Sequence, residues 1–221
     1  MKTHCKVIVA SALLAFTSVV LSAQNGFDWK IAELPHIQRT EGTPQTATTP
    51  LGNVAVFGGS DAYFLDTNPL KGLDKFTLEI VFKPDGDGRF DQRFLHIGTA
   101  SGERVMFEIR MNRDSTWYFD THIAMSDGGR LTMINEKLTH PADRWFHAAL
   151  VIDGIRAAVY INGVVEFDEP LAFVPVNEGL ASIGVRQNLA SWFKGSMYRL
   201  RITPYPLTKD KFLTDYHALN Q

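Results

Sequence analysis

The chain has 221 residues, 45% of them hydrophobic, and its 22 lysines and arginines nearly balance 24 aspartates and glutamates. Because nucleic-acid binding depends on clustered positive charge, a formal net charge of −2 gives no reason to expect a nucleic-acid partner. The length suits one all-β domain.

The first residues have the pattern of a secretory signal. Lys2 and Lys6 precede an apolar run over residues 7–21, which small residues follow. The run is too short for a membrane span, so we expect residues 1–23 to be a signal peptide and the mature protein to have no stable membrane insertion. A retained signal anchor is the alternative. Export would place the protein in a periplasmic, cell-surface or extracellular location, that is, secreted. Removal of Cys5 with the signal would leave no cysteine for disulfides, thiol catalysis or zinc ligation.

Residues 24–52 show little periodicity and include a Thr/Pro-rich stretch over 40–50, so we expect an extended lead-in, either a first edge strand or a loose tether. From Val54 onward, short alternating runs are separated by turn residues such as those at 127–129 and 162–163. This spacing is typical of a β-sandwich. No second domain is indicated.

Period-2 alternation assigns one face of each run to the core. The residues expected between two packed sheets are Phe76, Leu78, Phe82, Leu95, Phe107, Phe119, Leu150, Val159, Leu200 and Ile202. Pro204 and Pro206 end the last strand, because proline cannot donate to a ladder. Thr208 is then predicted to cap a short helix whose apolar positions are Phe212, Leu213, Tyr216 and Leu219.

The same alternation predicts a polar outer face on the strands over 92–97, 104–110 and 116–124. Its predicted members, taken as candidate ligand-binding residues, are Gln92, His96, Glu108, Arg110, Tyr118, Asp120 and His122, with Phe94 also facing outward. A turn at 112–115 makes the last two strands a hairpin, which sets Glu108 opposite Asp120 or Tyr118 and lets Arg110 bridge two carboxylates. The alternative is an ordinary solvated face, on which such ion pairs contribute about 0–1 kcal/mol each.

Four segments resemble laminin-G-like domains of the concanavalin A-like jelly-roll family. In chain order they are Val56-Phe-Gly-Gly-Ser-Asp-Ala-Tyr-Phe64, Phe76-Thr-Leu-Glu-Ile-Val-Phe-Lys-Pro84, Trp145-Phe-His-Ala-Ala-Leu-Val-Ile-Asp-Gly154 with Ala158-Val-Tyr-Ile-Asn-Gly163, and the closing segment 192–208. The resemblance implies an all-β, two-sheet antiparallel sandwich over residues 53–208, followed by a C-terminal helix and tail over 209–221.

The family resemblance also implies a ligand and a metal. The concave sheet face of such jelly rolls is where saccharides usually lie, so the expected partner is a polysaccharide or other glycoconjugate. A structural calcium ion is the one cofactor that the resemblance suggests, with Asp61 at the matching position. Gly58 and Ala62 stand where the family often has aspartates, so neighbouring oxygen ligands are missing. His147 matches a histidine of the family hairpin and is expected to be structural.

The sequence therefore favours a secreted, non-catalytic module that binds glycan or another surface component. A small polysaccharide lyase or glycoside hydrolase is the second hypothesis, with Tyr118 or His122 as base and Glu108 and Asp120 as an acid–base pair. The Glu-x-Asp-x-x-Glu string of many glycosidase jelly rolls does not occur. A structural or adhesive envelope protein is the third hypothesis.

Overall fold

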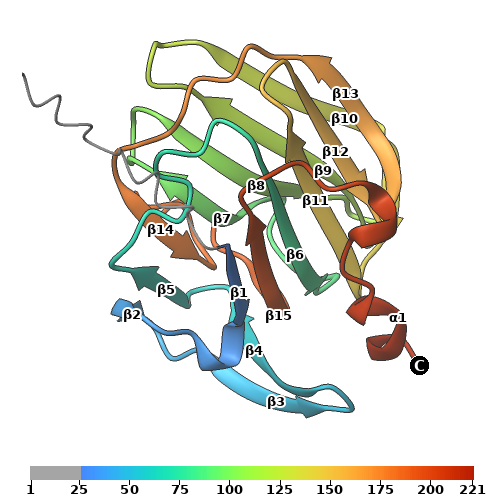
Figure 1. The fold of residues 1–221 in the computed structure, drawn as a ribbon. Helices are drawn as coiled ribbons and strands as arrows, with labels where there is room; N and C mark the ends of the chain where they lie inside the picture. The colour runs from blue at the N-terminus through green and yellow to red at the C-terminus, as the bar shows by residue number, and fades with distance from the viewer. Residues whose placement is uncertain (1–25) are drawn as a thin grey trace, which may run out of the picture.

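The structure is a sandwich of two antiparallel sheets. The computed structural model describes residues 26–221, in which the two sheets pack face to face and a short helix ends the chain (Figure 1). The predicted all-β jelly-roll class is thereby confirmed. The predicted signal peptide lies outside the described residues.

The first sheet has eight strands. Their order is β13 (Val164–Pro170), β12 (Arg156–Ile161), β11 (Phe146–Ile152), β6 (Phe76–Pro84), β15 (Lys194–Thr203), β4 (Gly52–Gly58) and β3 (Gln45–Thr49), while β1 (Phe27–Lys30) pairs with β15 off this path. The central strand β6 is buried along nearly its whole length. A strand covered on both sides needs a layer on its outer face as well as the core on its inner face.

The second sheet has seven strands. Their order is β10 (Arg130–Pro141), β9 (Thr116–Ala124), β8 (Arg104–Met111), β7 (Asp91–Gly98), β14 (Leu180–Ile183), β5 (Ala62–Leu65) and β2 (Ile37–Glu41). Strands β7 to β10 are consecutive in both sequence and space, so they form a meander. Turn residues between them set the register of this meander.

The lead-in over 24–52 contributes strands to both sheets. Strand β1 joins the first sheet, a 3-10 turn η1 (Ile31–Glu33) follows, and β2 and β3 then form one edge of each sheet. The Thr/Pro-rich stretch therefore lies in edge strands, where few apolar side chains are buried and alternation is weak.

The core forms between the inner faces of the two sheets. All ten residues predicted to be buried there are at most 1% exposed. Aromatic rings make up much of its centre, where Trp117 meets Phe82 at 5.4 Å and Phe107 meets Phe119 at 5.1 Å between ring centroids. The predicted core is confirmed.

A β-bulge interrupts the pairing of β7 with β8. Arg93 pairs with Glu108 and Leu95 with Phe107, so Phe94 is the extra residue. Phe94 is fully buried, and its ring stacks on Phe82 at 4.7 Å. The prediction that Phe94 faces outward is wrong, because strict alternation does not anticipate a bulge.

Gln92 is also on the inner side of this bulge. Its side chain is fully buried, its Nε2 donates to the carbonyl oxygen of Arg89, and its Oε1 accepts the backbone N–H of Lys194 at 2.8 Å. The prediction that Gln92 belongs to the polar outer face is wrong. Its amide instead joins the start of β7 to the start of β15.

The C-terminal segment covers the outer face of the first sheet. It contains a 3-10 turn η2 (Lys209–Lys211) and the helix α1 (Asp215–Leu219), so the helix predicted to start at Thr208 is broken in two. Thr208 precedes the first piece but makes no capping bond to its backbone. In residues 26–221, no helix has the length and apolarity to cross a membrane.

A buried carboxylate fixes this segment to the sheet. Glu79 of β6 accepts the backbone N–H of Leu213 at 2.8 Å and also bonds His147 at 3.1 Å and Arg201 at 2.6 Å. Leu213 and Tyr216 then complete a small apolar cluster. His147 has the structural role expected of it.

Phe94→Ala tests the bulge. The substitution should lower the free energy of unfolding by about 3–5 kcal/mol, because it removes a ring from the centre of the core. Phe90→Ala is the matched control, since Phe90 is 58% exposed and should change stability by no more than about 0.5 kcal/mol. Chemical denaturation of both variants measures the difference. Equal, small effects would mean that Phe94 faces solvent.

Candidate functional site

The outward residues of β7, β8, β9 and β10 form one polar face, called the polar face below. The hairpin register sets Glu108 directly opposite Asp120, Arg110 opposite Tyr118, and Met106 opposite His122. The bulge then adds Arg93, which pairs with Glu108 from the other side. Charged side chains of three strands therefore meet in the middle of the sheet.

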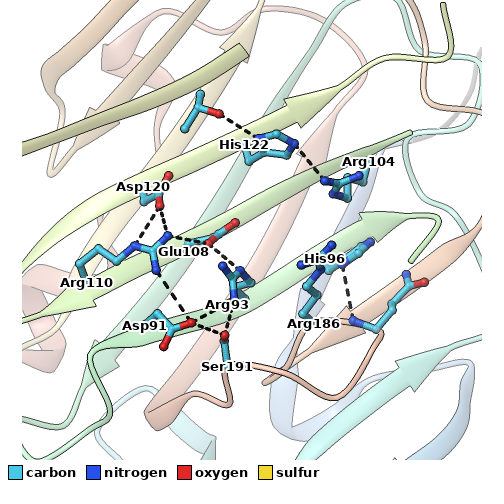
Figure 2. A network of polar contacts seen from close by, with 12 residues as sticks. Asp91, Arg93, His96, Arg104, Glu108, Arg110, Asp120, His122, Arg186 and Ser191 are labelled. Carbon is cyan, nitrogen blue, oxygen red and sulfur yellow. Dashed lines mark hydrogen bonds and ion pairs between the residues drawn. The ribbon is translucent and has the colours of Figure 1, made fainter. Parts of the chain in front are cut away.

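An ion cluster occupies one half of the polar face (Figure 2). Arg110 donates to Asp120 Oδ2 from Nη2 at 2.6 Å and from Nε at 3.0 Å, and its Nη2 lies 3.4 Å from Glu108 Oε2. Arg93 Nε lies 2.8 Å from the same oxygen of Glu108. The predicted bridging of Glu108 and Asp120 by Arg110 is confirmed, and Arg93 is an additional partner that alternation alone did not indicate.

This cluster is buried rather than solvated. The side chains of Glu108 and Asp120 are each only 4% exposed, so the expectation of ordinary surface ion pairs is wrong. Burial raises the pKa of Glu108, and the negative charge of Asp120 raises it further, while Arg93 and Arg110 oppose both effects. The two arginines thus offset part of the cost of burying two adjacent carboxyl groups.

Residues outside the hairpin complete this half. Asp91, at the start of β7, is 3.1 Å from Arg93 and 3.9 Å from Arg110. Ser191, in the loop before β15, bonds both Asp91 and Arg93. Because Ser191 comes from a distant loop, no local pattern in the sequence indicates its position.

The other half of the polar face is built around Arg104 and His122. Arg104 Nη1 donates to the carbonyl oxygens of Ser101 and Gly102, and Nη2 lies 3.1 Å from His122 Nε2. A guanidinium only donates, so His122 Nε2 accepts and the ring proton resides on Nδ1, which donates to Thr132 at 2.9 Å. Burial and then the charge of Arg104 lower the pKa of His122 to about 4. His122 is therefore neutral at neutral pH.

Two predicted site residues belong to the strands of the polar face, but their side chains are buried. His96 is fully buried, and its Nε2 donates to the carbonyl oxygen of Thr99 at 2.9 Å. Burial is the main cause that lowers its pKa to about 4. Tyr118 is 7% exposed and has Thr139 of β10 beside it. His96 and Tyr118 therefore pack beneath the polar face and are not accessible on its surface.

A pocket of about 180 Å³ opens on the polar face. It is lined by Arg93, Arg104, Met106, Glu108, Arg110, Asp120, His122, Thr132 and Arg186. Four predicted residues line it (Glu108, Arg110, Asp120 and His122), whereas Gln92, His96 and Tyr118 do not. Arg186 comes from the loop after β14, so, like Ser191, it could not be found by strand alternation. With His122 neutral, four arginines face two carboxylates, and the lining is net positive.

The candidate calcium ligand Asp61 has a different role in the fold. Its Oδ2 accepts the N–H of Gly58 at 2.6 Å and its Oδ1 accepts the N–H of Thr43 at 2.8 Å. Both oxygens thus hold a turn, and an oxygen that accepts an N–H points at a donor rather than at a cation. Across residues 26–221, no group of three or more His, Cys, Asp or Glu side chains is placed to hold a metal ion. In this arrangement Asp61 and its neighbours do not fit a calcium site. Calcium binding therefore stays a prediction that only the family resemblance supports.

Arg110→Ala tests the burial of the ion cluster. Among the described residues, Arg110 is the one ion-pair partner of Asp120. The other carboxylate oxygen of Asp120, Oδ1, is buried and has no hydrogen-bond partner among them. The variant should therefore lose about 3 kcal/mol of unfolding free energy, because a buried carboxylate is left uncompensated. Arg113→Ala, in the exposed turn between β8 and β9, is the control and should change stability by no more than about 0.5 kcal/mol. Urea denaturation with the same midpoint for Arg110→Ala and the parent would show that the cluster is solvated.

Solved structures with similar folds include several proteins from different classes. Domain 4 of AbnA, an extracellular arabinanase from Geobacillus stearothermophilus solved with arabinotriose, has a TM-score of 0.60 at 22% identity and covers 89% of this chain and 88% of its own. The receptor-binding domain of botulinum neurotoxin D has a TM-score of 0.59 at 14% identity over 89% of this chain and 48% of its own. A heptameric SAP-like pentraxin from Limulus polyphemus has a TM-score of 0.52 at 19% identity over 70% of this chain and 76% of its own.

Identities this low show a shared fold alone, and this chain spans about half the length of the neurotoxin chain. No curated protein matches the sequence. The model of the concanavalin A-like lectin/glucanases superfamily, of the laminin G type, matches residues 57–211, which is more than half of the chain. The protein therefore belongs to the concanavalin A-like lectin/glucanase superfamily.

Proposed function

We propose that the protein is an exported, non-catalytic carbohydrate-binding module and that the pocket on the polar face is its glycan site. The observation that supports this most is the pocket itself, whose lining offers guanidinium donors and carboxylate acceptors side by side. Saccharide hydroxyls both donate and accept, so such a mixed lining suits them. Domain 4 of the arabinanase, which has a similar fold, was solved with a trisaccharide.

Rigidity of the lining also supports binding. Glu108, Arg110 and Asp120 fix one another through the ion cluster, and their β-strands belong to the middle of the sheet rather than to loops. A site whose side chains are already ordered loses less conformational entropy when the ligand arrives. A shallow pocket with few apolar groups can bind a polar ligand on this basis.

The geometry favours binding over catalysis. Both ring nitrogens of His122 are engaged, one by Arg104 and one by Thr132, and Tyr118 lies beneath the face. A general base needs a lone pair directed at the substrate. Glu108 and Asp120 both bond to the guanidinium of Arg110, so neither carboxyl group is without a protein partner when a substrate arrives. The lyase and hydrolase hypotheses therefore have less support than binding.

A bulky substitution in the pocket tests this proposal without changing its charge. Thr132 is exposed and lines the pocket, so Thr132→Trp should fill it and abolish binding. Thr46→Trp is the control, since Thr46 is exposed on the edge strand β3 of the other sheet. Affinity gels containing arabinan, galactan, polygalacturonate or alginate measure retention. The parent and Thr46→Trp should be retarded by at least one polysaccharide, and Thr132→Trp by none.

The same gels separate the alternatives. Polysaccharide recovered from the parent lanes should keep its chain length. Unsaturated products absorbing in the ultraviolet, lost on changing Tyr118 or His122, would establish a lyase instead. Absence of retention on every polysaccharide would favour a structural or adhesive protein without a glycan ligand.

A further inference from the structure

We propose that the ligand of this pocket carries an anionic group, either the carboxylate of an acidic sugar or a sulfate ester, and that Arg104 and Arg186 bind it. This inference rests on the proposed glycan site and specifies the chemical class of its ligand. It follows from a difference between the two halves of the polar face. In one half each charged side chain has an ion-pair partner, and in the other the arginines have none within residues 26–221.

The ion cluster leaves two pocket arginines without an ion-pair partner among the described residues. Arg93 and Arg110 are paired with Glu108, Asp120 and Asp91. Arg104 and Arg186 have no carboxylate within ion-pair distance anywhere in residues 26–221. Figure 2 shows Arg104 beside His122 and Arg186 near His96, away from the three carboxylates.

Burial makes the lack of an ion-pair partner at Arg104 significant. Arg104 is only 8% exposed, and a buried charge is costly unless an opposite charge compensates it. Burial lowers the pKa of Arg104, and the positive charges of Arg186 and Arg130 lower it further, while the negative charge of Glu108 opposes these effects only in part. The Nε atoms of Arg104 and Arg186 are buried and have no hydrogen-bond acceptor among the described residues. An anion in the pocket would relieve the repulsion between these arginines.

Neighbouring groups hold Arg104 in place without neutralising it. The carbonyl oxygens of Ser101 and Gly102 accept from Nη1, and the neutral ring of His122 accepts from Nη2. Arg186 has a single bond of this kind, from Nη2 to the carbonyl oxygen of Ala100 at 3.3 Å. Planar guanidinium groups match carboxylate and sulfate oxygens in geometry as well as in charge. The arrangement is therefore suited to an anion rather than to a neutral hydroxyl group.

A purely structural role explains only part of this geometry. The bonds from Arg104 to Ser101 and Gly102 fix the turn between β7 and β8, and a neutral donor could make them equally well. They do not require a second arginine beside the first. Arg186 is half-buried and makes few bonds, so its charge can be removed with little effect on folding.

The experiment measures binding of the parent, Arg186→Gln, Arg104→Gln and Arg144→Gln to three probes. Polygalacturonate supplies carboxylates, its fully methyl-esterified form supplies the same sugar without charge, and heparin supplies sulfate esters. Arg144 is the matched control, because it is exposed and lines a different pocket beside Trp145 and Tyr216. Thermal unfolding of each variant verifies that it is folded.

The parent should bind polygalacturonate or heparin, and which of the two it binds identifies the anionic group. Arg186→Gln and Arg104→Gln should each weaken that binding about tenfold or more, because each removes a charge-assisted hydrogen bond, while Arg144→Gln binds as the parent does. If Arg104→Gln does not fold, Arg186→Gln alone decides the result.

Three results would overturn the inference. Binding of the methyl ester as tightly as the acid, or unchanged binding by Arg186→Gln, would show that the ligand needs no anionic group. Either result would be compatible with the proposed glycan site. Equal weakening by Arg144→Gln would show diffuse charge attraction instead of a site. Failure to bind these probes or any polysaccharide of the gel panel would overturn the glycan site as well.

Discussion

The β-bulge in β7 is the local constraint on which both the core and the polar face depend. By adding one residue between Arg93 and Leu95, it lets Phe94 and Leu95 both enter the core. It also changes the parity of the strand, so that Arg93 faces outward against Glu108 and Gln92 faces inward. Bulges often occur where a strand must redirect a side chain toward a functional surface. Without this one, Glu108 would have a single cationic neighbour.

The paired and unpaired charges of the polar face follow from that placement. Two carboxylates lie opposite each other on adjacent strands, which destabilises a sheet unless cations lie between them. Arg93 and Arg110 provide this compensation, so their charges are not available to a ligand. Arg104 and Arg186 remain without an ion-pair partner in residues 26–221, and Arg104 lies beside a neutral histidine. The polar face thus stabilises its own carboxylates in one half and leaves an anion-binding capacity in the other.

How far the sequence predicts this structure depends on whether alternation is regular. Strands β8 and β9 form a regular hairpin, so period 2 correctly placed Glu108, Arg110 and Asp120 together. Strand β7 breaks the period, and two of its predicted orientations, those of Gln92 and Phe94, were therefore wrong. The depth of the cluster and the contribution of Arg186 depend on packing and on a distant loop, which no local pattern encodes. Helical spacing after Thr208 likewise did not reveal that the segment bends to bond Glu79.

The central claim is that Arg104 and Arg186 of the polar face receive the anionic group of a saccharide. NMR of the arginine Nε–Hε groups, titrated with a galacturonate oligomer, tests it most directly, because an anion beside a guanidinium shifts the Nε–Hε resonance of that side chain. The account predicts saturable shifts for Arg104 and Arg186 and unchanged resonances for Arg144. Shifts confined to Arg144 or other exposed arginines, or no shifts at Arg104 and Arg186 when the oligomer binds, would contradict it.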